Sequence, residues 1–416
     1  MVYPWANLDS VPCLCRTIER LADAGFDVDV FTRFDAAHVP PRFRTRGVRL
    51  FAPWNRDRRP GFAKRWSDET YATWLLTRRH LTRRYRCVIG VDPAGLNHAD
   101  VMNQWVRTSL VYYSLELLLS DEIRSPGHHW LKRRELEASR RASLVIIQDE
   151  HRGRLLTTDN HLQAERFAYV PNAPSGPARR RRHDRWHRQF NLAGDARVAL
   201  HAGSIDAWTG IEDIVRSVQH WPAKWVLVIH TREAAENSPV IQRLRQLAPS
   251  GRVHFSLTPV PRDEYDELID AADAGIVMYV PVEGSAYAQE NVRTIGLSSG
   301  KVAYYLRAGL PVVVNDASSL GAFVREHRCG EVVQRAADLR EAVERLDAHE
   351  AVYSANALTT FRERLDFDQS IAPVIERIRK LKPDAQHREA PWWKLKSWMT
   401  SLVRPRPVGT TRPAVH

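Results

Sequence analysis

The sequence predicts an α/β protein with two Rossmann-like domains that face a shared cleft. Its 416 residues are too many for one ordinary hydrophobic core. Short β-branched strands alternate with amphipathic helices in two successive blocks, which is typical of doubly wound sheets. Such sheets bind ligands beyond the carboxyl ends of their strands, so two of them predict a site between the domains.

The first block, residues 1–172, is predicted to be one domain. Strands are expected at 28–31, 87–92, 110–115, 144–147 and 168–170, and helices at 13–24, 68–83 and 131–140. The first helix should itself follow a strand, but only two residues precede Tyr3. Either that strand is nearly missing, or translation starts upstream of Met1.

The second block, residues 193–365, repeats the alternation. Strands are expected at 198–204, 225–229, 253–255, 275–279 and 312–314, and helices at 211–219, 240–247, 263–271, 301–308, 337–348 and 350–364. A further helix within 366–385 is predicted to return to the first domain.

Residues 173–192 are predicted to be a linker, because they combine proline, glycine and arginine without apolar periodicity. The arginine run at 179–182 could touch nucleic acid or a membrane. It could equally be an exposed, solvated segment, which is the more common use of such runs.

Charge and cysteine content narrow the class of protein. The net charge of +12 favours anionic partners such as phosphates, anionic lipids or nucleic acid. The four cysteines form no metal-binding or disulfide pattern. No apolar run is long enough to span a bilayer, so we expect a cytoplasmic protein.

The tail, residues 386–416, is basic and carries tryptophans. Trp392, Trp398 and neighbouring lysines would suit a peripheral contact with the inner face of an anionic membrane. Packing back onto the protein is an equal alternative. We expect the last dozen residues to be disordered.

The stretch that points most clearly to function is the turn Gly-Leu-Ser-Ser-Gly-Lys at 296–301. Glycines and serines before a helix leave backbone N–H groups unpaired and let a ligand approach closely. The helix dipole and Lys301 add positive charge. We therefore expect a diphosphate there, although such a turn alone is more often a plain helix cap.

Four phrases of the sequence resemble the GT-B glycosyltransferases of the family 4 type. They are the helix and strand within 3–30, Val-Pro-Asn-Ala at 170–173, His-Ala-Gly-Ser at 201–204 with Trp-Thr-Gly at 208–210, and the segment 299–313. The resemblance covers about residues 3–335. It implies transfer of a hexosyl-type sugar from a nucleotide sugar to a glycan or lipid-linked acceptor, without a metal cofactor, in polysaccharide biosynthesis.

The chain departs from the family pattern at two places. Gly296 and Tyr304 stand where the family commonly has a pair of glutamates. Ser204 and Thr209 stand where it has Arg and Lys after the first donor-domain glycine. We therefore expect the ribose and diphosphate contacts to differ from those of the family.

The turn and the resemblance together give the candidate site. Arg293 and Lys301 are expected to stabilise the leaving diphosphate. Glu116 follows a strand and is the candidate base for an inverting reaction, with His128 and His129 as rivals. Donor-binding residues are expected at Gly203, Ser204, Glu283, Glu290, Asn291, Gly296, Ser298, Ser299, Gly300 and Tyr304. The glutamates could also be ordinary surface carboxylates.

Two other functions remain open from the sequence. A nucleotide-sugar epimerase can share this architecture and needs no second substrate. A non-catalytic basic protein would use the arginine run to bind nucleic acid, and the missing family glutamates and cations favour it modestly.

Overall fold

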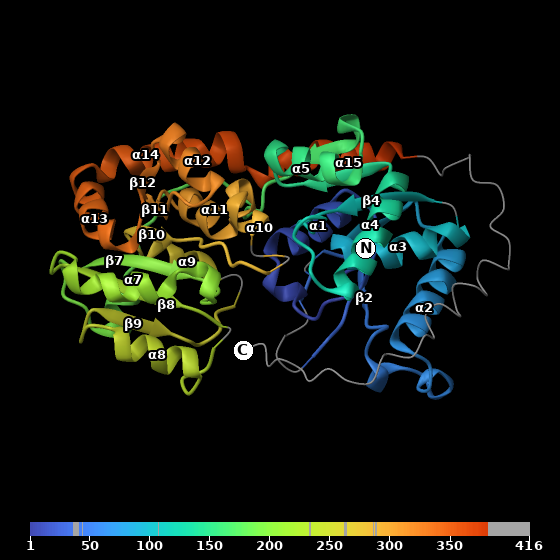
Figure 1. The fold of residues 1–416 in the computed structure, drawn as a ribbon, viewed down its shortest axis with the longest axis horizontal. Helices are drawn as coiled ribbons and strands as arrows, with labels where there is room; N and C mark the ends of the chain where they lie inside the picture. The colour runs from blue at the N-terminus through green and yellow to red at the C-terminus, as the bar shows by residue number, and fades with distance from the viewer. Residues whose placement is uncertain are drawn as a thin grey trace.

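The computed structural model describes residues 1–381 apart from 36–40, 44, 107, 233, 262–263, 286 and 288. These residues form two α/β domains that lie side by side (Figure 1). Every pairing between the named strands is parallel. The predicted fold class, two Rossmann-like domains, is confirmed.

The first domain contains β1 to β6 and α1 to α5. Its strands are β1 (Val28–Phe31), β2 (Val48–Phe51), β3 (Cys87–Val91), β4 (Ser109–Tyr113), β5 (Leu144–Ile147) and β6 (Phe167–Tyr169). Its helices are α1 (Pro12–Asp23), α2 (Asp68–Arg83), α3 (Asp92–Val106), α4 (Pro126–Arg141) and α5 (Glu150–Asn160). The sequence prediction missed β2, α3 and α5. Arginines surround β2, and α3 contains Gly95 and several weak helix formers.

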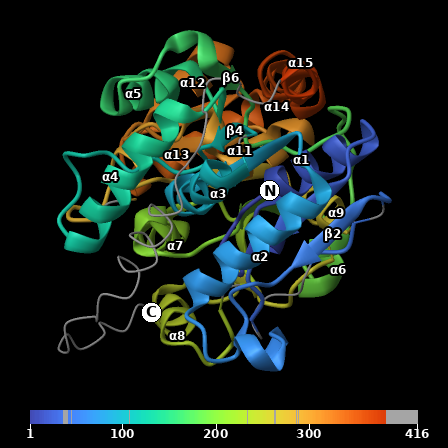
Figure 2. The same ribbon diagram turned by 90° about the vertical axis from the view of Figure 1, so that its right-hand side faces the viewer.

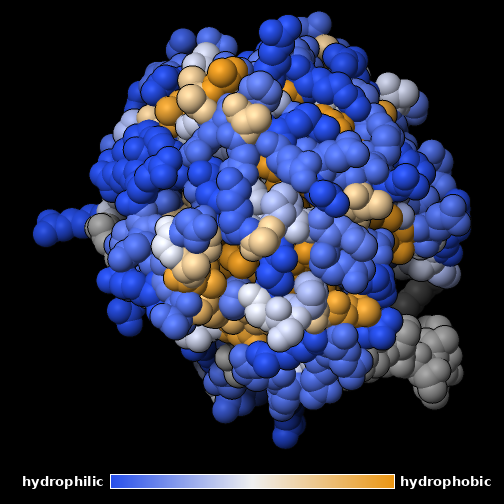
Figure 3. All heavy atoms as spheres, turned by 90° about the vertical axis from the view of Figure 1, so that its left-hand side faces the viewer, coloured by the Kyte–Doolittle hydropathy of each residue, from blue (hydrophilic) through white to orange (hydrophobic). Residues whose placement is uncertain are grey.

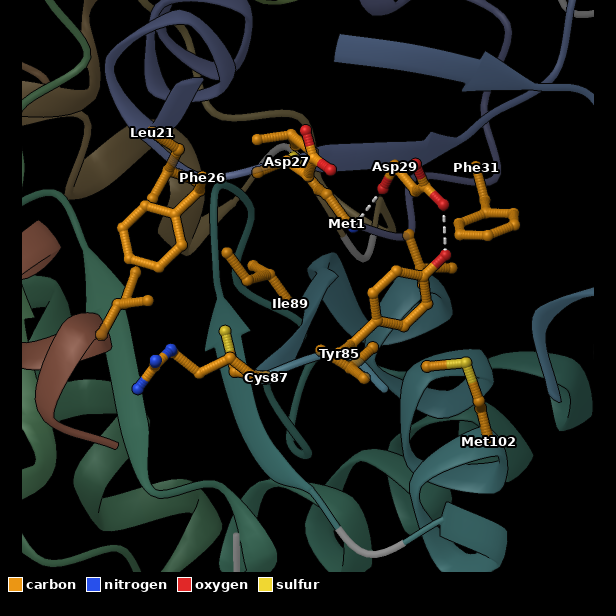
Figure 4. Close-up of a pocket in the computed structure, with 15 residues that line it drawn as sticks. Met1, Leu21, Phe26, Asp27, Asp29, Phe31, Tyr85, Cys87, Ile89 and Met102 are labelled. Carbon is orange, nitrogen blue, oxygen red and sulfur yellow. Dashed lines mark hydrogen bonds between the residues drawn. The ribbon is translucent and has the colours of Figure 1, made fainter. Parts of the chain in front are cut away.

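The first residues of the chain lie between β1 and β3. Val2 pairs in parallel with Phe31 and with Gly90, so it joins β1-β2 to β3-β4-β5-β6. The ammonium group of Met1 donates to the carbonyl of Asp29 at 2.7 Å. Figure 4 shows Met1 among the residues that line a pocket, together with residues of β1 and β3. Only residues 1–3 therefore occupy the place where the alternation predicts a first strand.

The second domain contains β7 to β12. Its strands are β7 (Arg197–Ala202), β8 (Trp225–His230), β9 (Val253–Ser256), β10 (Ala274–Val277), β11 (Val312–Asn315) and β12 (Gly330–Val333), in the order β12-β11-β10-β7-β8-β9. Its helices are α6 (Arg185–Phe190), α7 (Ile211–Ser217), α8 (Pro239–Leu247), α9 (Tyr265–Asp270), α10 (Glu290–Arg293), α11 (Gly300–Arg307), α12 (Ser319–His327), α13 (Leu339–Ala348) and α14 (Glu350–Thr360). Its outer face is largely hydrophilic, with scattered apolar residues (Figure 3).

The predicted linker packs against the second domain. Ala178 is 7% exposed and Trp186, in α6, is fully buried. Arg180 donates to the carbonyl of Ala272 at 3.1 Å, and Arg182 forms an ion pair with Glu350 at 3.0 Å. Arg179, Arg181 and Arg182 are exposed, as expected of a solvated run, whereas Arg180 is half-buried against the second domain.

The last described helix, α15 (Phe367–Lys380), lies over the first domain (Figure 2). Asp368 at its start forms an ion pair with Arg20 at 2.7 Å, and Arg377 donates to the carbonyl of Phe167 at 2.6 Å. The predicted tail, 386–416, lies outside the described residues. None of the helices in the described part of the chain is long and apolar enough to cross a membrane.

Gly275, in the central strand β10, makes a close contact that we expect to be essential for packing. A β-carbon there would lie 2.1 Å from Cδ2 of Tyr305, whose hydroxyl is fixed to β7 by donating to the carbonyl of Leu200. We predict that Gly275→Ala lowers the free energy of unfolding by roughly 1–3 kcal/mol through overpacking.

Urea denaturation of the full chain would test this prediction. Gly194→Ala is the matched control, because an added β-carbon there meets no atom within 4 Å. Equal denaturation midpoints for the two variants would contradict the packing argument.

Candidate active site at the junction of the domains

The candidate site lies where the strand order of the second domain reverses. β7 and β10 are neighbours, and from them the chain adds β8 and β9 on one side and β11 and β12 on the other. Ligands of open α/β sheets bind beyond the carboxyl ends of the strands at such a switch point. The segments that follow β7 and β10, and the start of α11, meet here.

Lys301 covers the turn that follows β7. A β-carbon at Gly203 would lie only 2.7 Å from Cε of Lys301, and the φ of Gly203 is +127°, a conformation that favours glycine. Nζ of Lys301 lies 3.3 Å from the carbonyl oxygen of Ser204. The structure therefore brings together Gly203, Ser204 and Lys301, three of the residues that the sequence placed in the donor site.

His201, which the sequence analysis left without a role, links these groups. It is fully buried, and its Nε2 lies 3.0 Å from the carbonyl oxygen of Ser204 and 3.3 Å from Nζ of Lys301. Burial lowers the pKa of His201 to about 3, and the charge of Lys301 acts in the same direction. A neutral imidazole thus supports the lysine and the turn without adding positive charge.

Aromatic side chains lie beside Lys301. Trp208 and Tyr279 stack with ring centroids 5.7 Å apart, and Nζ of Lys301 lies 5.8 Å from the Trp208 centroid. The hydroxyls of Tyr279 and Ser299 are 2.8 Å apart. Ser299 is buried and caps α11 by accepting from the amide of Val302, so its side chain orients the helix.

Tyr304 occupies the place of a family glutamate, and its ring packs against other aromatic residues. Its centroid is 5.0 Å from that of Tyr265, and the guanidinium of Arg307 lies 5.5 Å from its ring. A phenol in this setting cannot supply the carboxylate that the family pattern would place here.

Asn291 joins the two domains. It is 2% exposed, its Oδ1 accepts from the amide of Leu117, and its Nδ2 donates to the carbonyl of the same residue, both at 2.7 Å. The predicted role of Asn291 in donor binding is therefore corrected, because both ends of its amide are used by the first domain.

The turn before α11 also touches the first domain. A β-carbon at Gly296 would lie 3.2 Å from Oδ2 of Asp149. Asn172 donates to the carbonyl of Ser298 at 3.1 Å, and its side chain lies beside Gly300. Oγ of Ser298 is buried and has no hydrogen-bond partner among the described residues. The interdomain turn thus fixes the start of α11 at the junction.

Arg293 belongs to an acidic group at the junction. Its ion pair with Glu290 spans 2.6 Å, and half of its side chain is exposed. The amide of Glu290 donates to Glu122 at 2.9 Å, and Glu283 is exposed nearby in the chain. The structure thus joins Arg293 to carboxylates, whereas Lys301 is joined to the Gly203 turn.

Two carboxylates from the first domain lie at the junction. Glu116 follows β4, as expected, and is exposed to solvent. Asp92 follows β3 with a φ of +55°, and its Oδ1 accepts from the amides of Leu115 (2.7 Å) and Glu116 (3.0 Å). Asp92 was missed, although its place directly after a strand was the same signal that selected Glu116.

The surroundings of these carboxylates favour their protonated forms. Burial raises the pKa of Asp92 to about 7, and the negative charge of Glu116 adds to this shift. Glu116 is exposed at the surface, but the protein around it removes part of its hydration, and this desolvation raises its pKa. The charge of Arg152 opposes both shifts.

Arg152 is the buried cation of the junction. It is 1% exposed, and its Nη2 donates to the carbonyl of Leu115 at 2.9 Å and to Oδ1 of Asn291 at 2.8 Å. No sequence signal identified it, because a single arginine within a helix has no special pattern.

The rival bases lie at the start of α4, which begins five residues earlier than predicted. His128 packs edge-on against Tyr287 with ring centroids 5.6 Å apart. The backbone amide of His129 donates to the carbonyl of Ser125 within the first turn.

In the part of the chain that the structure describes, no group of three His, Cys, Asp or Glu residues could hold a metal ion.

Part of the second domain matches a known family model. Residues 266–370 match the family model described as "Glucosyltransferase 3-like, C-terminal domain", a range that includes α11. No curated protein sequence matches the chain.

Solved structures of glycosyltransferases share the fold. A sucrose-phosphate synthase from Thermosynechococcus elongatus superposes with a TM-score of 0.69 at 16% identity, over 91% of this chain and 95% of that one. HepE of Anabaena, in complex with UDP-glucose, gives 0.67 at 17% identity, over 89% and 95%. WaaG, a glycosyltransferase involved in lipopolysaccharide biosynthesis, gives 0.62 at 13% identity, over 91% and 98%.

The resemblance to GT-B glycosyltransferases is thus confirmed at the level of fold. The chain has the GT-B fold, and its residues 266–370 match the C-terminal domain of the glucosyltransferase 3-like family.

Proposed function

We propose that the protein is a glycosyltransferase that moves a hexosyl-type sugar from a nucleotide sugar to a glycan or lipid-linked acceptor, without a metal ion. One observation carries the proposal. Three features meet at the switch point of the second domain: the turn after β7, Lys301 and the start of α11. Lys301 and α11 lie within the segment that matches a glucosyltransferase family, and the turn after β7 lies outside it. A glycine turn, a cation and a helix N-terminus together suit a diphosphate.

The main task of such a site is to stabilise the leaving group. Glycosyl transfer leaves negative charge on the departing nucleoside diphosphate. Lys301 and the first-turn amides of α11 would interact with that charge, and His201 would keep the ammonium group over the Gly203 turn. Gly203 leaves room for the Lys301 side chain because it has no side chain of its own.

The carboxylates of the first domain would act on the acceptor. In an inverting reaction a base must take the proton of the attacking hydroxyl, and a base works best when its pKa is close to the working pH. Glu116 is the base predicted from the sequence, and Asp92, with a pKa of about 7, is a second candidate from the structure.

The alternatives have less support than transfer. The arginine run has internal partners at Arg180 and Arg182, which weakens the argument for nucleic-acid binding. Incubation with a nucleotide sugar alone separates epimerisation, which gives a new sugar nucleotide, from slow hydrolysis by a transferase. A cytoplasmic enzyme with its tail at the inner membrane face remains a prediction, because residues 386–416 lie outside the described residues.

Thermal unfolding with added nucleotides gives the first test. UDP, GDP, dTDP and ADP are compared on the full chain, because a ligand that binds only the folded form raises its stability. The UDP-glucose complex of HepE makes the uridine nucleotide our expected ligand. If none of the four raises the unfolding temperature at millimolar concentration, the donor-site proposal is wrong.

Lys301→Ala should remove turnover while leaving the fold intact. Loss of one charge-stabilising group typically costs on the order of 100-fold or more in rate. Release of nucleoside diphosphate is measured by coupled assay, and circular dichroism checks the fold. Lys224→Ala is the control, since Lys224 pairs with Asp347 on the surface of the same domain. Wild-type activity in Lys301→Ala would remove the diphosphate role.

Asp92→Asn should stabilise the protein at high pH. The folded state raises the pKa of Asp92 to about 7, so ionising Asp92 costs free energy in the folded protein. The stability of the protein is therefore unaffected by Asp92 below about pH 4 and falls as the pH rises to 7. Asparagine can still accept the two amide hydrogen bonds. We expect a gain of about 2 kcal/mol at pH 8.5, allowing for partial solvation.

The gain should shrink toward pH 5, as measured by urea unfolding at both pH values. Asp121→Asn, which changes an exposed carboxylate of the same domain, is the control. If the stability difference between Asp92→Asn and the wild-type protein does not vary with pH, Asp92 does not have the raised pKa.

A further inference from the structure

We propose that the surface formed by α2 and the loop before it docks on an anionic phospholipid bilayer. We call it the α2 surface and define it by Lys64, Arg65, Trp66, Trp74 and Arg78. The proposal goes beyond the transferase function, because this part of the first domain lies away from the candidate site. It also concerns a different part of the chain from the predicted membrane contact of the tail.

Residues 56–84 hold much of the positive charge of the protein. They contain nine Lys or Arg residues and three Asp or Glu residues, so their net charge is +6. Residues 382–416, which include the tail, contain seven and two, which gives +5. Because the whole chain carries +12, all other residues together are almost neutral. The excess positive charge is therefore concentrated in two segments, and the structure describes the one that contains α2.

Aromatic contacts hold the α2 surface together. The ring centroids of Trp66 and Trp74 lie 5.7 Å apart, and the guanidinium of Arg78 lies 5.2 Å from the ring centroid of Trp74. Trp74 and Arg78 are four residues apart in α2, so they lie on one face of the helix. Lys64 and Arg65 directly precede Trp66 in the chain. The five residues therefore form one continuous strip.

The cations of this strip reach solvent. Lys64, Arg65 and Arg78 are exposed, and none of the three forms an ion pair with another described residue. By contrast, the buried Arg59 of the same segment is paired with Asp68 at 2.6 Å. The charges of the strip are therefore available to a partner outside the chain.

Exposed carboxylates offset only part of this charge. Asp57 lies 4.0 Å from Arg58, and Glu69 is exposed in the first turn of α2. Arg83 and Arg84, both exposed at the other end of the helix, add positive charge. The electrostatic potential around α2 therefore stays positive and favours an anionic partner.

The position of α2 leaves room for a large partner. The helix lies at the end of the first domain that faces away from the second domain (Figure 1, Figure 2). Within the described part of the chain it packs mainly on α3. A bilayer on this surface would therefore leave the junction of the domains open to the substrates.

Like charge disfavours two partners from within the protein. Residues 382–416 carry a net charge of +5 and would be repelled by the α2 surface. The α2 surface of a second copy would be repelled for the same reason. The occupant that matches the charge is therefore an anionic partner from outside the chain.

The tryptophans favour a bilayer over nucleic acid. Indole rings beside basic side chains are typical of the membrane interface, where Lys and Arg are also attracted to an anionic leaflet. Nucleic acid would instead use the ring faces for stacking on bases. Tyr71 stacks on Trp74 with ring centroids 5.6 Å apart, and Arg78 lies over the same ring, so contacts within the protein compete with base stacking.

Vesicle co-sedimentation of the full chain tests the proposal. Vesicles of phosphatidylcholine alone are compared with vesicles that also contain phosphatidylglycerol, at low and at physiological salt. We expect binding to the anionic vesicles alone, and weaker binding at the higher salt. The triple variant Lys64→Gln, Arg65→Gln and Arg78→Gln should bind on the order of 100-fold more weakly, because it lacks three cations near the bilayer.

A second triple variant is the matched control. Arg328→Gln, Arg340→Gln and Arg364→Gln remove the same charge from exposed positions of the second domain, and this variant should bind like the wild-type protein. Equal binding of the two triple variants would overturn the inference. Tighter binding of the wild-type protein to duplex DNA than to anionic vesicles would also overturn it.

Donor hydrolysis separates this inference from the proposed function. The α2 variant should release nucleoside diphosphate from a nucleotide sugar at the wild-type rate, because none of the three residues lies at the candidate site. If the wild-type protein releases none but binds anionic vesicles through α2, the proposed function is wrong and the membrane inference stands.

Discussion

The arrangement of the candidate site depends on the contact between Lys301 and the glycine turn that follows β7. The side chain of Lys301 crosses Gly203, and this is possible because that position carries no β-carbon. His201 below and Trp208 beside the ammonium group fix it from two further directions. Any β-carbon at Gly203 would push the lysine away, so the glycine and the lysine act as a unit.

This contact gains its position from the order of the strands. β7 and β10 are adjacent in the sheet but far apart in the sequence, and α11 returns to them through the buried ring of Tyr305, whose hydroxyl bonds to both Leu200 and Ala202. The helix that carries Lys301 is therefore fixed to the strand that carries the turn. The contact of Tyr305 with β7 therefore both packs the core and sets the geometry of the site.

The junction brings ionisable groups of both domains together. The second domain contributes Lys301 at the turn, and the first contributes Asp92 and Glu116 at the carboxyl ends of β3 and β4. Asn291 and Arg152 hold the two sides together by hydrogen bonds across the boundary.

The sequence by itself determined the fold class and the two blocks of alternating elements, and it predicted the Gly-Lys turn as the centre of the site. These features are local, since strand and helix periodicity and turn chemistry are set by neighbouring residues. It did not identify β2 among its arginines, and it placed Asn291 in donor binding.

Only the tertiary structure decided which distant side chains share a site. It assigned Asn291 to the domain contact, brought His201 and Trp208 to Lys301, and placed Asp92 beside Glu116. These relations join residues separated by many positions, and their hydrogen bonds form only when the strands are in register and the domains meet. No local pattern records such contacts, because each partner is an ordinary residue until the fold brings the other one to it.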